Sequence, residues 1–537
     1  MGPQKTRRYT RTTSLTIGRS TTMSTNKNEL NVLTAADMTA AQLELEADAV
    51  IIGSGAGGGI NAYELAKAGK KVIVLEAGPY VPSEKFTEMM AVSMATMYEG
   101  EGAQSNTDGD ITVLQGRCVG GSTVVNAALC FRTPDYYLKK WAKEYGLTNL
   151  TPEVMLPYFE KVEKNLGITE VKGHETSVGA EYIKKGMQKL DMPIGLARRN
   201  IRDCAITGFC FAGCKTDRKQ SMMVTYLPWA CNHGAVIYAD TKVTRINTSN
   251  GKASGVSAEV IDPKTNKVKT RMVVKAPIVV LAAGPTGSPL LLQQSGLANS
   301  SGQVGKNFAC HPSLSVTAMF DKKLNDFHGA THSLFDDSHT LPEDGGWIQL
   351  NAVQDPVEAS FMAEPGTGKP YVRYMQNYPN STRLITLIHD KNVGEVTLEN
   401  GYKEIRYQVD DEDFEAMKKG LKDNARILFA AGAKYLYLPT SDKQRINAVG
   451  EIDSVIDALK NEPARYRYTS FHPQGTCRMG ADKSKTVVNP YGETHDVKKL
   501  YVVDASLLPT SIGYNPSETV YALASYIADH INEANPS

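Results

Sequence analysis

Three glycines and a carboxylate near the start of the chain have the types and spacing to hold a dinucleotide. Gly53, Gly55 and Gly58 stand at G-x-G-x-x-G spacing, and Glu76 follows about twenty residues later. The first glycine allows a tight turn, the second lets the backbone approach a pyrophosphate, and the third lets helix and strand pack closely. Glu76 is placed to accept a hydrogen bond from a ribose hydroxyl. The surrounding pattern predicts a strand, a helix and a second strand at 49–52, 61–68 and 71–75.

A second candidate for chemistry is a group of three cysteines with C-x5-C-x3-C spacing, Cys204, Cys210 and Cys214. Three thiolates suit an iron-sulfur cluster, whereas a buried free thiol packs as a small apolar side chain. Free thiols, a cluster and a disulfide all remain open, and we favour free thiols and no metal. The other five cysteines show no ligand spacing.

The composition sets the broad class. A chain of 537 residues with 41% hydrophobic and 22% charged residues is typical of a globular protein with two or three domains. Its net charge of +1 makes nucleic acid an unexpected partner. No run of eighteen apolar residues occurs, so we predict no transmembrane span and leave peripheral membrane contact open.

The N-terminal segment 1–46 differs from the rest. Its first 22 residues hold five basic residues and no acidic one, without the apolar segment of a secretory signal. We expect a partly disordered tail followed by an acidic leader helix over 34–46, and a cytoplasmic location. An organelle transit peptide, or a true start at Met23, is the alternative.

Further motifs carry a resemblance to a known family. Gly116-Arg117-x-x-Gly120-Gly121-Ser122-Thr123-x-x-Asn126 is a second glycine-rich stretch, and the later motifs begin at 284, 304, 472, 504 and 515. In this order they resemble the glucose-methanol-choline (GMC) oxidoreductases, FAD enzymes that act on alcohols. Some members attach FAD covalently through a histidine, but Val125 stands at that position here. The resemblance therefore implies non-covalent FAD.

The resemblance also implies an architecture, α/β in class and α+β overall. A Rossmann-like FAD-binding domain would comprise 47–315, with a cysteine-containing insertion at 200–230, and would be completed by 466–537. A substrate-binding domain on a largely antiparallel sheet would comprise 316–465. Within it the pattern predicts strands and one helix, at 371–375, 383–389, 395–398 and 411–431.

The same resemblance assigns roles. His472 would be the catalytic base or hydrogen-bond partner of the substrate oxygen, Asn515 its neighbour, and His311 a structural residue. An imidazole suits proton transfer near neutrality, whereas an amide does not titrate. The expected FAD-binding residues are Gly53, Gly55, Gly58, Glu76, Gly116, Arg117, Gly120, Gly121, Ser122, Asn126, Val243, Asp504, Ala505 and Pro516.

The substrate is expected to be a hydrophobic primary alcohol. Apolar side chains gather in one interval and could form a pocket: Phe327, Phe335, Trp347, Phe361, Met362, Tyr371, Tyr374, Met375 and Tyr378. The electron acceptor stays open between oxygen, a quinone and a cytochrome. Two alternative functions are a GMC-type hydroxynitrile lyase with non-redox FAD, and an iron-sulfur GMC sugar or polyol dehydrogenase that passes electrons to a cytochrome.

Overall fold

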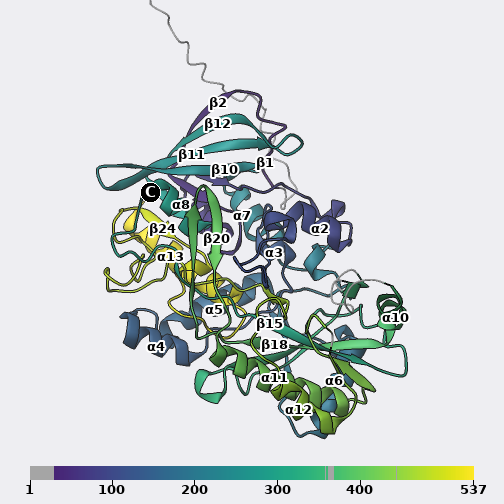
Figure 1. The fold of residues 1–537 in the computed structure, drawn as a ribbon. Coiled ribbons are helices and arrows are strands. Elements are labelled where there is room, and N and C mark those ends of the chain that lie inside the picture. Colours follow the sequence, from purple (N-terminus) through teal and green to yellow (C-terminus); the bar gives the residue numbers. More distant parts are fainter. Residues whose placement is uncertain (1–29, 357–358, 361–367, 443, 537) are drawn as a thin grey trace, which may run out of the picture.

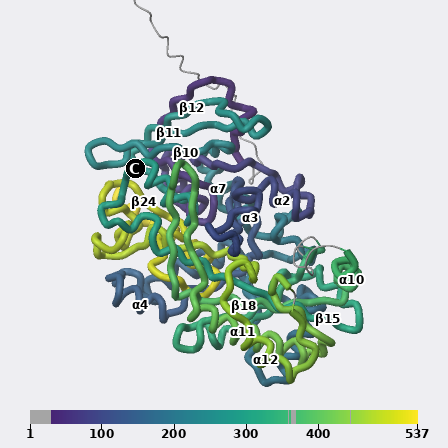
Figure 2. Tube along the Cα trace, in the orientation of Figure 1, coloured from purple at the N-terminus to yellow at the C-terminus, as the bar shows by residue number. Residues whose placement is uncertain are grey.

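The N-terminal and C-terminal parts of the chain fold together. The computed structural model describes residues 30–356, 359–360, 368–442 and 444–536 (Figure 1). In both figures the early, purple segments and the late, yellow ones share the upper half of the molecule (Figures 1 and 2). Most green segments lie below them, except the green hairpin of β19 (Gly394–Glu399) and β20 (Tyr402–Arg406), which reaches up beside the yellow segments. Phe361 and Met362 and most of the N-terminal tail lie outside the described residues.

A parallel sheet forms the framework of the upper half. Its strands, in spatial order, are β1 (Val32–Leu33), β9 (Val236–Tyr238), β4 (Val72–Leu75), β3 (Ala49–Ile52), β13 (Ile278–Leu281) and β24 (Leu500–Val502). The middle strands are apolar and buried throughout, as expected for a parallel sheet covered on both faces. Helix α1 (Ala56–Lys67) follows β3, starting five residues before the predicted helix, and packs on α7 (Tyr226–Asn232) and α13 (Ser517–Ala534).

A second sheet contains the segment 42–46, which was predicted to be helical. It comprises β10 (Thr241–Ser249), β11 (Lys252–Asp262), β12 (Lys267–Lys275) and β2 (Gln42–Glu46). The leader helix predicted over 34–46 is wrong, because Gln42–Glu46 is a strand that pairs with β12 in parallel. Leu43 and Leu45 alternate with polar residues there, and this period of two suits an edge strand with one face toward the core.

The lower half is built on a largely antiparallel sheet. Its described strands are, in spatial order, β22 (Arg445–Ile446), β21 (Tyr435–Tyr437), β15 (Ser313–Met319), β18 (Ser381–Ile388), β17 (Trp347–Ala352), β16 (Leu334–Asp336) and β7 (Gly195–Leu196). Off this path, β23 (Tyr468–Ser470) pairs with β15, and β5 (Ile111–Val113) pairs with β23. Helix α11 (Asp411–Ala430) crosses β15, β17 and β18 and packs on α6 (Val178–Lys189). Figure 1 shows α11 and α6 below this sheet.

Most predicted elements of this half are confirmed, with one exception. The strands at 383–389 and 395–398 and the helix at 411–431 correspond to β18, β19 and α11. The strand predicted at 371–375 is wrong, because α10 (Lys369–Asn377) occupies it. Its aromatic residues stand three and four positions apart and bring Tyr374 against Met319 and Tyr437 on one helix face.

The remaining strands and α-helices lie outside these three sheets and the helices already described. They are a three-stranded sheet of β14 (Lys306–Phe308), β19 (Gly394–Glu399) and β20 (Tyr402–Arg406), the pair β6 (Thr169–Glu170) and β8 (Arg198–Arg199), and the helices α2 (Met90–Met97), α3 (Ser122–Val125), α4 (Asp135–Tyr145), α5 (Pro152–Leu166), α8 (Ser288–Ser295) and α12 (Ile452–Asp457).

Each half of the molecule has one of the two largest hydrophobic cores. Strands β5, β7 and β23 of the lower sheet come from outside the predicted substrate-binding domain, 316–465. The domain boundaries stay a prediction. Among the described residues, no helix combines the length and apolarity needed to cross a bilayer.

Candidate active site

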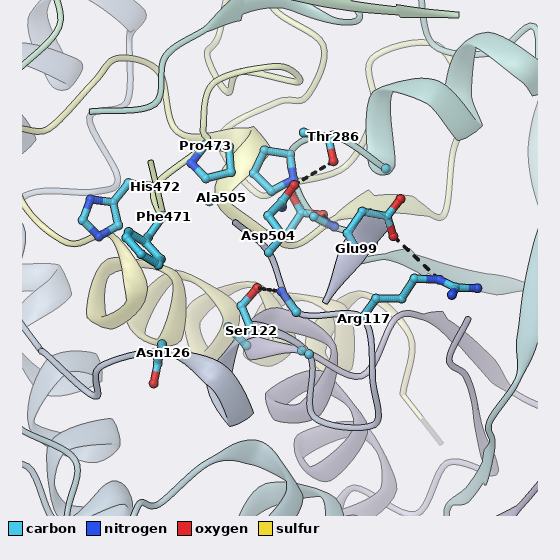
Figure 3. Close-up of a pocket in the computed structure, with 18 of the residues that line it drawn as sticks. Glu99, Arg117, Ser122, Asn126, Thr286, Phe471, His472, Pro473, Asp504 and Ala505 are labelled. Carbon is cyan, nitrogen blue, oxygen red and sulfur yellow. Dashed lines mark hydrogen bonds and ion pairs between the residues drawn. The ribbon is translucent and has the colours of Figure 1, made fainter. Parts of the chain in front are cut away.

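One cavity of about 840 Å³ joins most of the predicted site residues. Of the cofactor-binding and catalytic residues predicted from the sequence, all except Gly58 and Gly120 line it. Figure 3 shows His472 and Phe471 on one side of this pocket and Glu99 and Arg117 on the other, with Asp504 and Ser122 between them. The pocket is therefore elongated and differs in chemistry from end to end.

The two glycine-rich turns meet at the middle of the cavity. Gly121 has φ +56°, and a Cβ atom placed on it would lie 2.8 Å from the Cα of Gly55. The Ser54 hydroxyl accepts a hydrogen bond from the Gly120 N–H at 2.9 Å and so ties the turns together. Backbone without side chains therefore lines this part of the wall, as a bulky diphosphate requires.

Gly58 acts away from the cavity, as the motif predicts. A Cβ atom on it would lie 2.0 Å from the carbonyl oxygen of Gly53, so only glycine allows α1 to approach β3 closely. The neighbouring Gly57 has the same property toward Val503, where the distance would be 1.6 Å. No local pattern indicated the second contact, because Val503 is distant in sequence.

The end of the cavity near β4 and β10 contains Glu76 and Val243. Glu76 accepts hydrogen bonds from Ser54 N–H (3.0 Å), Ser54 Oγ (2.6 Å) and Gly78 N–H (2.8 Å). Burial raises the pKa of Glu76, and these hydrogen bonds oppose the rise. The carboxylate is thus held in place at the end where a ribose was predicted.

Charged residues at the rim of the same end were missed by sequence reasoning. Glu99 forms an ion pair with Lys403 at 2.9 Å and lies 3.7 Å from Arg117. Burial opposes ionisation of Glu99, but the nearby Lys403 and Arg117 outweigh it and lower its pKa. Lys403 comes from β20, so the β19–β20 hairpin closes the side of the cavity through this cluster.

Asp504 lies in the middle of the cavity wall. Its carboxylate accepts hydrogen bonds from Gly284 N–H (2.9 Å), Ser288 Oγ (2.6 Å) and Ser506 N–H (2.8 Å). It thereby joins the turn after β13 to the segment after β24. This connection explains how two distant motifs form one wall.

His472 and Asn515 meet at the opposite end. The His472 Nε2 and Asn515 Nδ2 atoms are 2.9 Å apart, and both residues line the cavity. The Oδ1 atom of Asn515 is buried and has no hydrogen-bond partner among the described residues. Pro516 directly follows this pair and is the N-cap of α13, which begins at Ser517.

His311 belongs to this cluster, a contact that sequence reasoning did not foresee. Its Nδ1 atom lies 3.3 Å from His472 Nδ1, and its Nε2 atom lies 2.9 Å from Ser511 Oγ. Ser511 in turn donates to the buried carboxylate of Asp390 at 2.7 Å. A continuous chain of polar groups therefore runs from the cavity to Asp390.

The chain allows two tautomeric arrangements. If His472 donates to His311, and His311 to Ser511, then His472 Nε2 carries a lone pair and can accept a proton. If His311 Nε2 instead accepts from the Gly513 N–H, 3.1 Å away, His472 presents an N–H to the cavity. The two arrangements make His472 a base or a hydrogen-bond donor.

Electrostatics favour an uncharged His472. Burial lowers the pKa of His472 well below its usual value, and the neighbouring His311 and His332 lower it further. Burial likewise lowers the pKa of His311. A neutral imidazole is therefore present at neutral pH.

Apolar side chains continue the cavity beyond His472. They are Leu129, Phe211, Leu314, Leu350, Ile385, Leu387 and Phe471. Phe211 and Phe471 stack with ring centroids 5.2 Å apart. The apolar pocket predicted from 327–378 is wrong in its members: none of those that the structure describes lines the cavity, since Trp347 and Tyr374, for example, belong to buried cores.

The three cysteines of the 200–230 segment do not converge on a metal. Cys204, Cys210 and Cys214 all have free thiols. In the part of the chain that the structure describes, no group of three His, Cys, Asp or Glu residues could hold a metal ion. None of the three forms a disulfide in the structure, and the choice between free thiols and a cluster stays a prediction.

Comparison with known proteins now decides the family. Models described as GMC oxidoreductase match residues 94–313 and 390–524, and one described as FAD binding domain matches 48–97. Long-chain-alcohol oxidase FAO3 of Arabidopsis thaliana is 31% identical over 520 residues, covering 91% of this chain and 68% of the relative. The chain is a GMC oxidoreductase. Another relative, the uncharacterised GMC-type oxidoreductase y4nJ of Sinorhizobium fredii, is also 31% identical, with 91% and 95% coverage.

Two solved structures of other oxidases share the fold. A formate oxidase of Aspergillus oryzae RIB40 superimposes with a TM-score of 0.69 at 17% identity, covering 91% of this chain and 99% of that one. Pyridoxine 4-oxidase from Mesorbium loti gives 0.65 at 20% identity, with 90% and 99% coverage. This GMC oxidoreductase is an FAD enzyme, and its paired glycine turns and the unpartnered Asn515 Oδ1 fit that cofactor.

Proposed function

We propose that this GMC oxidoreductase oxidises a hydrophobic primary alcohol to the aldehyde, with His472 as the base. The observation that carries the proposal is the juxtaposition in one cavity of the His472–Asn515 pair with an apolar wall. The names of the long-chain-alcohol oxidase relatives support an alcohol as the donor.

The cofactor would lie along the cavity from Glu76 to His472. Its adenosine end would contact Glu76 and Val243, its diphosphate the backbone of Gly55 and Gly121, and its isoalloxazine ring the walls near Asn515. Val125 is buried and does not line the cavity, which supports non-covalent attachment. Bound FAD supplies an acceptor for a hydride, that is, a proton and two electrons.

The protein residues would accept the hydroxyl proton of the alcohol and stabilise the protonated base. The alcohol C–H bond breaks as the hydride leaves, the donor carbon is oxidised, and the hydroxyl proton passes to His472 Nε2. In the first tautomeric arrangement His311, Ser511 and Asp390 accept hydrogen bonds in sequence and stabilise the positive charge on His472. Asn515 orients the substrate oxygen and does not titrate.

The start of α13 supports negative charge at this end. The helix begins at Ser517, next to Asn515 and Pro516, so its positive dipole end faces the cavity. Glu518 in its first turn does not cancel that field at neutral pH, because burial raises its pKa to about 8.

Anaerobic mixing of the FAD-loaded enzyme with alcohols of increasing chain length tests the proposal. We expect flavin bleaching with apolar primary alcohols and little with sugars. His472→Ala should slow bleaching about 10²- to 10⁴-fold with FAD still bound. His174→Ala, at an exposed histidine, is the matched control. An unchanged rate in His472→Ala would refute the base assignment, and preferred bleaching by sugars would refute the substrate class.

The pH dependence separates the two tautomeric roles. A base must be neutral, so its lowered pKa predicts a bleaching rate that stays level through neutral pH and falls only well below pH 6.5. A hydrogen-bond donor works equally well when protonated, so a rate that stays level into acid would favour the second arrangement.

A further inference from the structure

A lysine of the cysteine-containing segment is buried behind the cavity wall. The Lys219 side chain is 2% exposed. Its Nζ atom lies 2.6 Å from the carbonyl oxygen of Val124, 2.8 Å from that of Asn126 and 2.7 Å from that of Cys210. Three carbonyl acceptors at these distances require three N–H donors, which an ammonium has and a neutral amine lacks. The geometry therefore defines Lys219 as a buried cation.

No carboxylate compensates this charge. Within the described ranges of the chain, Lys219 makes no ion pair, and its side chain donates only to those three carbonyls. Burial lowers its pKa, and the nearby thiols of Cys210, Cys214 and Cys118 oppose that shift. An unpaired buried charge opposes folding, and a neutral amide would avoid that cost while still offering two of the three donors. The positive charge itself therefore calls for an explanation.

The cation lies one backbone layer from the cavity. Val124 and Asn126, whose carbonyls it holds, belong to the segment 122–127. Ser122, Asn126 and Ala127 of this segment line the same cavity as His472 and Asn515. Lys219 thus fixes the wall of the end where the hydride is transferred.

We propose that Lys219 positions the wall 122–127 and raises the reduction potential of the bound flavin. Hydride transfer from the donor carbon adds two electrons and one proton, so it leaves one negative charge on the flavin. A fixed cation behind the wall stabilises that charge in a site shielded from water. The inference rests on the proposed placement of the isoalloxazine ring beside His472 and Asn515.

The cysteine-containing segment takes part in holding Lys219. The backbone carbonyl of Cys210 is one of the three acceptors of the ammonium, and the Cys214 thiol accepts a hydrogen bond from the backbone N–H of Lys219 at 3.4 Å. The segment therefore forms the binding pocket of a lysine ammonium.

The test measures the flavin potential against a reference dye under anaerobic conditions. Lys219→Met removes the charge at similar length, and Lys219→Gln removes it but keeps two donors. Each should shift the flavin toward the oxidised form about tenfold, or about 30 mV for a two-electron couple. Lys418→Met, at a buried lysine of α11 that does not line the cavity, should leave the potential unchanged. FAD affinity, measured by fluorescence on reconstitution, reports the positioning role.

Unaltered potentials in FAD-loaded Lys219→Met and Lys219→Gln would overturn the inference. If neither variant retains FAD, Lys219→Arg decides: retention of FAD at the wild-type potential supports a role for the charge, and loss of FAD in all three variants overturns it. The potential is measured without an alcohol. Its outcome is therefore independent of the substrate and base assignments, which the alcohol and His472→Ala experiments test.

Discussion

Gly58 and Gly55 belong to one motif, yet the structure predicts opposite consequences for an alanine at each. At Gly58 the new Cβ atom would lie 2.0 Å from the Gly53 carbonyl oxygen and 3.3 Å from the Ile51 side chain. Real Cβ atoms do not approach backbone oxygen below about 3 Å, so the overlap is about 1 Å or more. The carbonyl cannot move easily, because the N–H of the same peptide unit, that of Ser54, donates to Glu76 Oε2 at 3.0 Å.

Gly58→Ala should therefore destabilise the fold. Overpacking against a fixed backbone costs about 1–3 kcal/mol, a large fraction of the 5–15 kcal/mol that holds a typical protein folded. At Gly55 the closest atom to a new Cβ is Gly121 Cα, at an ordinary 3.8 Å, and the residue lines the cavity. Gly55→Ala should destabilise the apoprotein by only about 1 kcal/mol or less, because Gly55 has a negative φ and alanine there loses only the N-cap preference of glycine.

FAD binding separates the two variants. The Gly55 Cβ would occupy space that the diphosphate needs, so we expect at least a tenfold weaker FAD affinity, about 1.4 kcal/mol. Thermal melting of the apoprotein and fluorescence titration with FAD measure the two effects. A Gly58→Ala protein that melts like wild type would refute the packing argument. Unaltered FAD affinity in Gly55→Ala would refute the diphosphate placement.

Three more predictions follow from the site. Burial raises the pKa of folded Glu518 to about 8, so its contribution to the free energy of unfolding is fully present below about pH 4.5 and is lost as pH rises through 8. Urea unfolding of Glu518→Gln should lack that decline, and a pH dependence identical to wild type would contradict the argument. Each methylene of the substrate that is buried on the apolar wall contributes about 0.8 kcal/mol, so kcat/KM should rise about fourfold for each CH₂ added to the alcohol. Leu387→Ser should reduce this dependence on chain length, and a dependence as steep as in wild type would show that this wall does not bind the alcohol chain. Asp390→Asn should slow anaerobic flavin bleaching by about tenfold or more with FAD retained; a wild-type rate would show that the chain from His472 does not stabilise the protonated base.

Local sequence patterns predicted the helices and strands whose residues show a clear apolar run or periodicity. The apolar runs of β3, β4 and β13, the glycines between β3 and α1, and the apolar stripe of α11 were all recognisable without tertiary information. The errors occurred where two periodicities compete over a few residues. The composition of Gln42–Glu46 suggested an acidic helix, whereas its apolar and polar residues alternate and the segment pairs with β12 as a strand. The aromatic residues of 371–375 suggested a strand because aromatic residues favour strands, but the segment is helical.

The candidate site divides in the same way. The sequence by itself determined the glycine turn, Glu76 and the family motif that contains His472, because these depend on residue type and local spacing. Only the tertiary structure decided the apolar wall from Leu350 and Leu387, the contact of Gly57 with Val503, and the chain through His311. It also revealed the ammonium of Lys219 behind Asn126. These contacts join segments separated by tens to hundreds of residues, and no local periodicity encodes them.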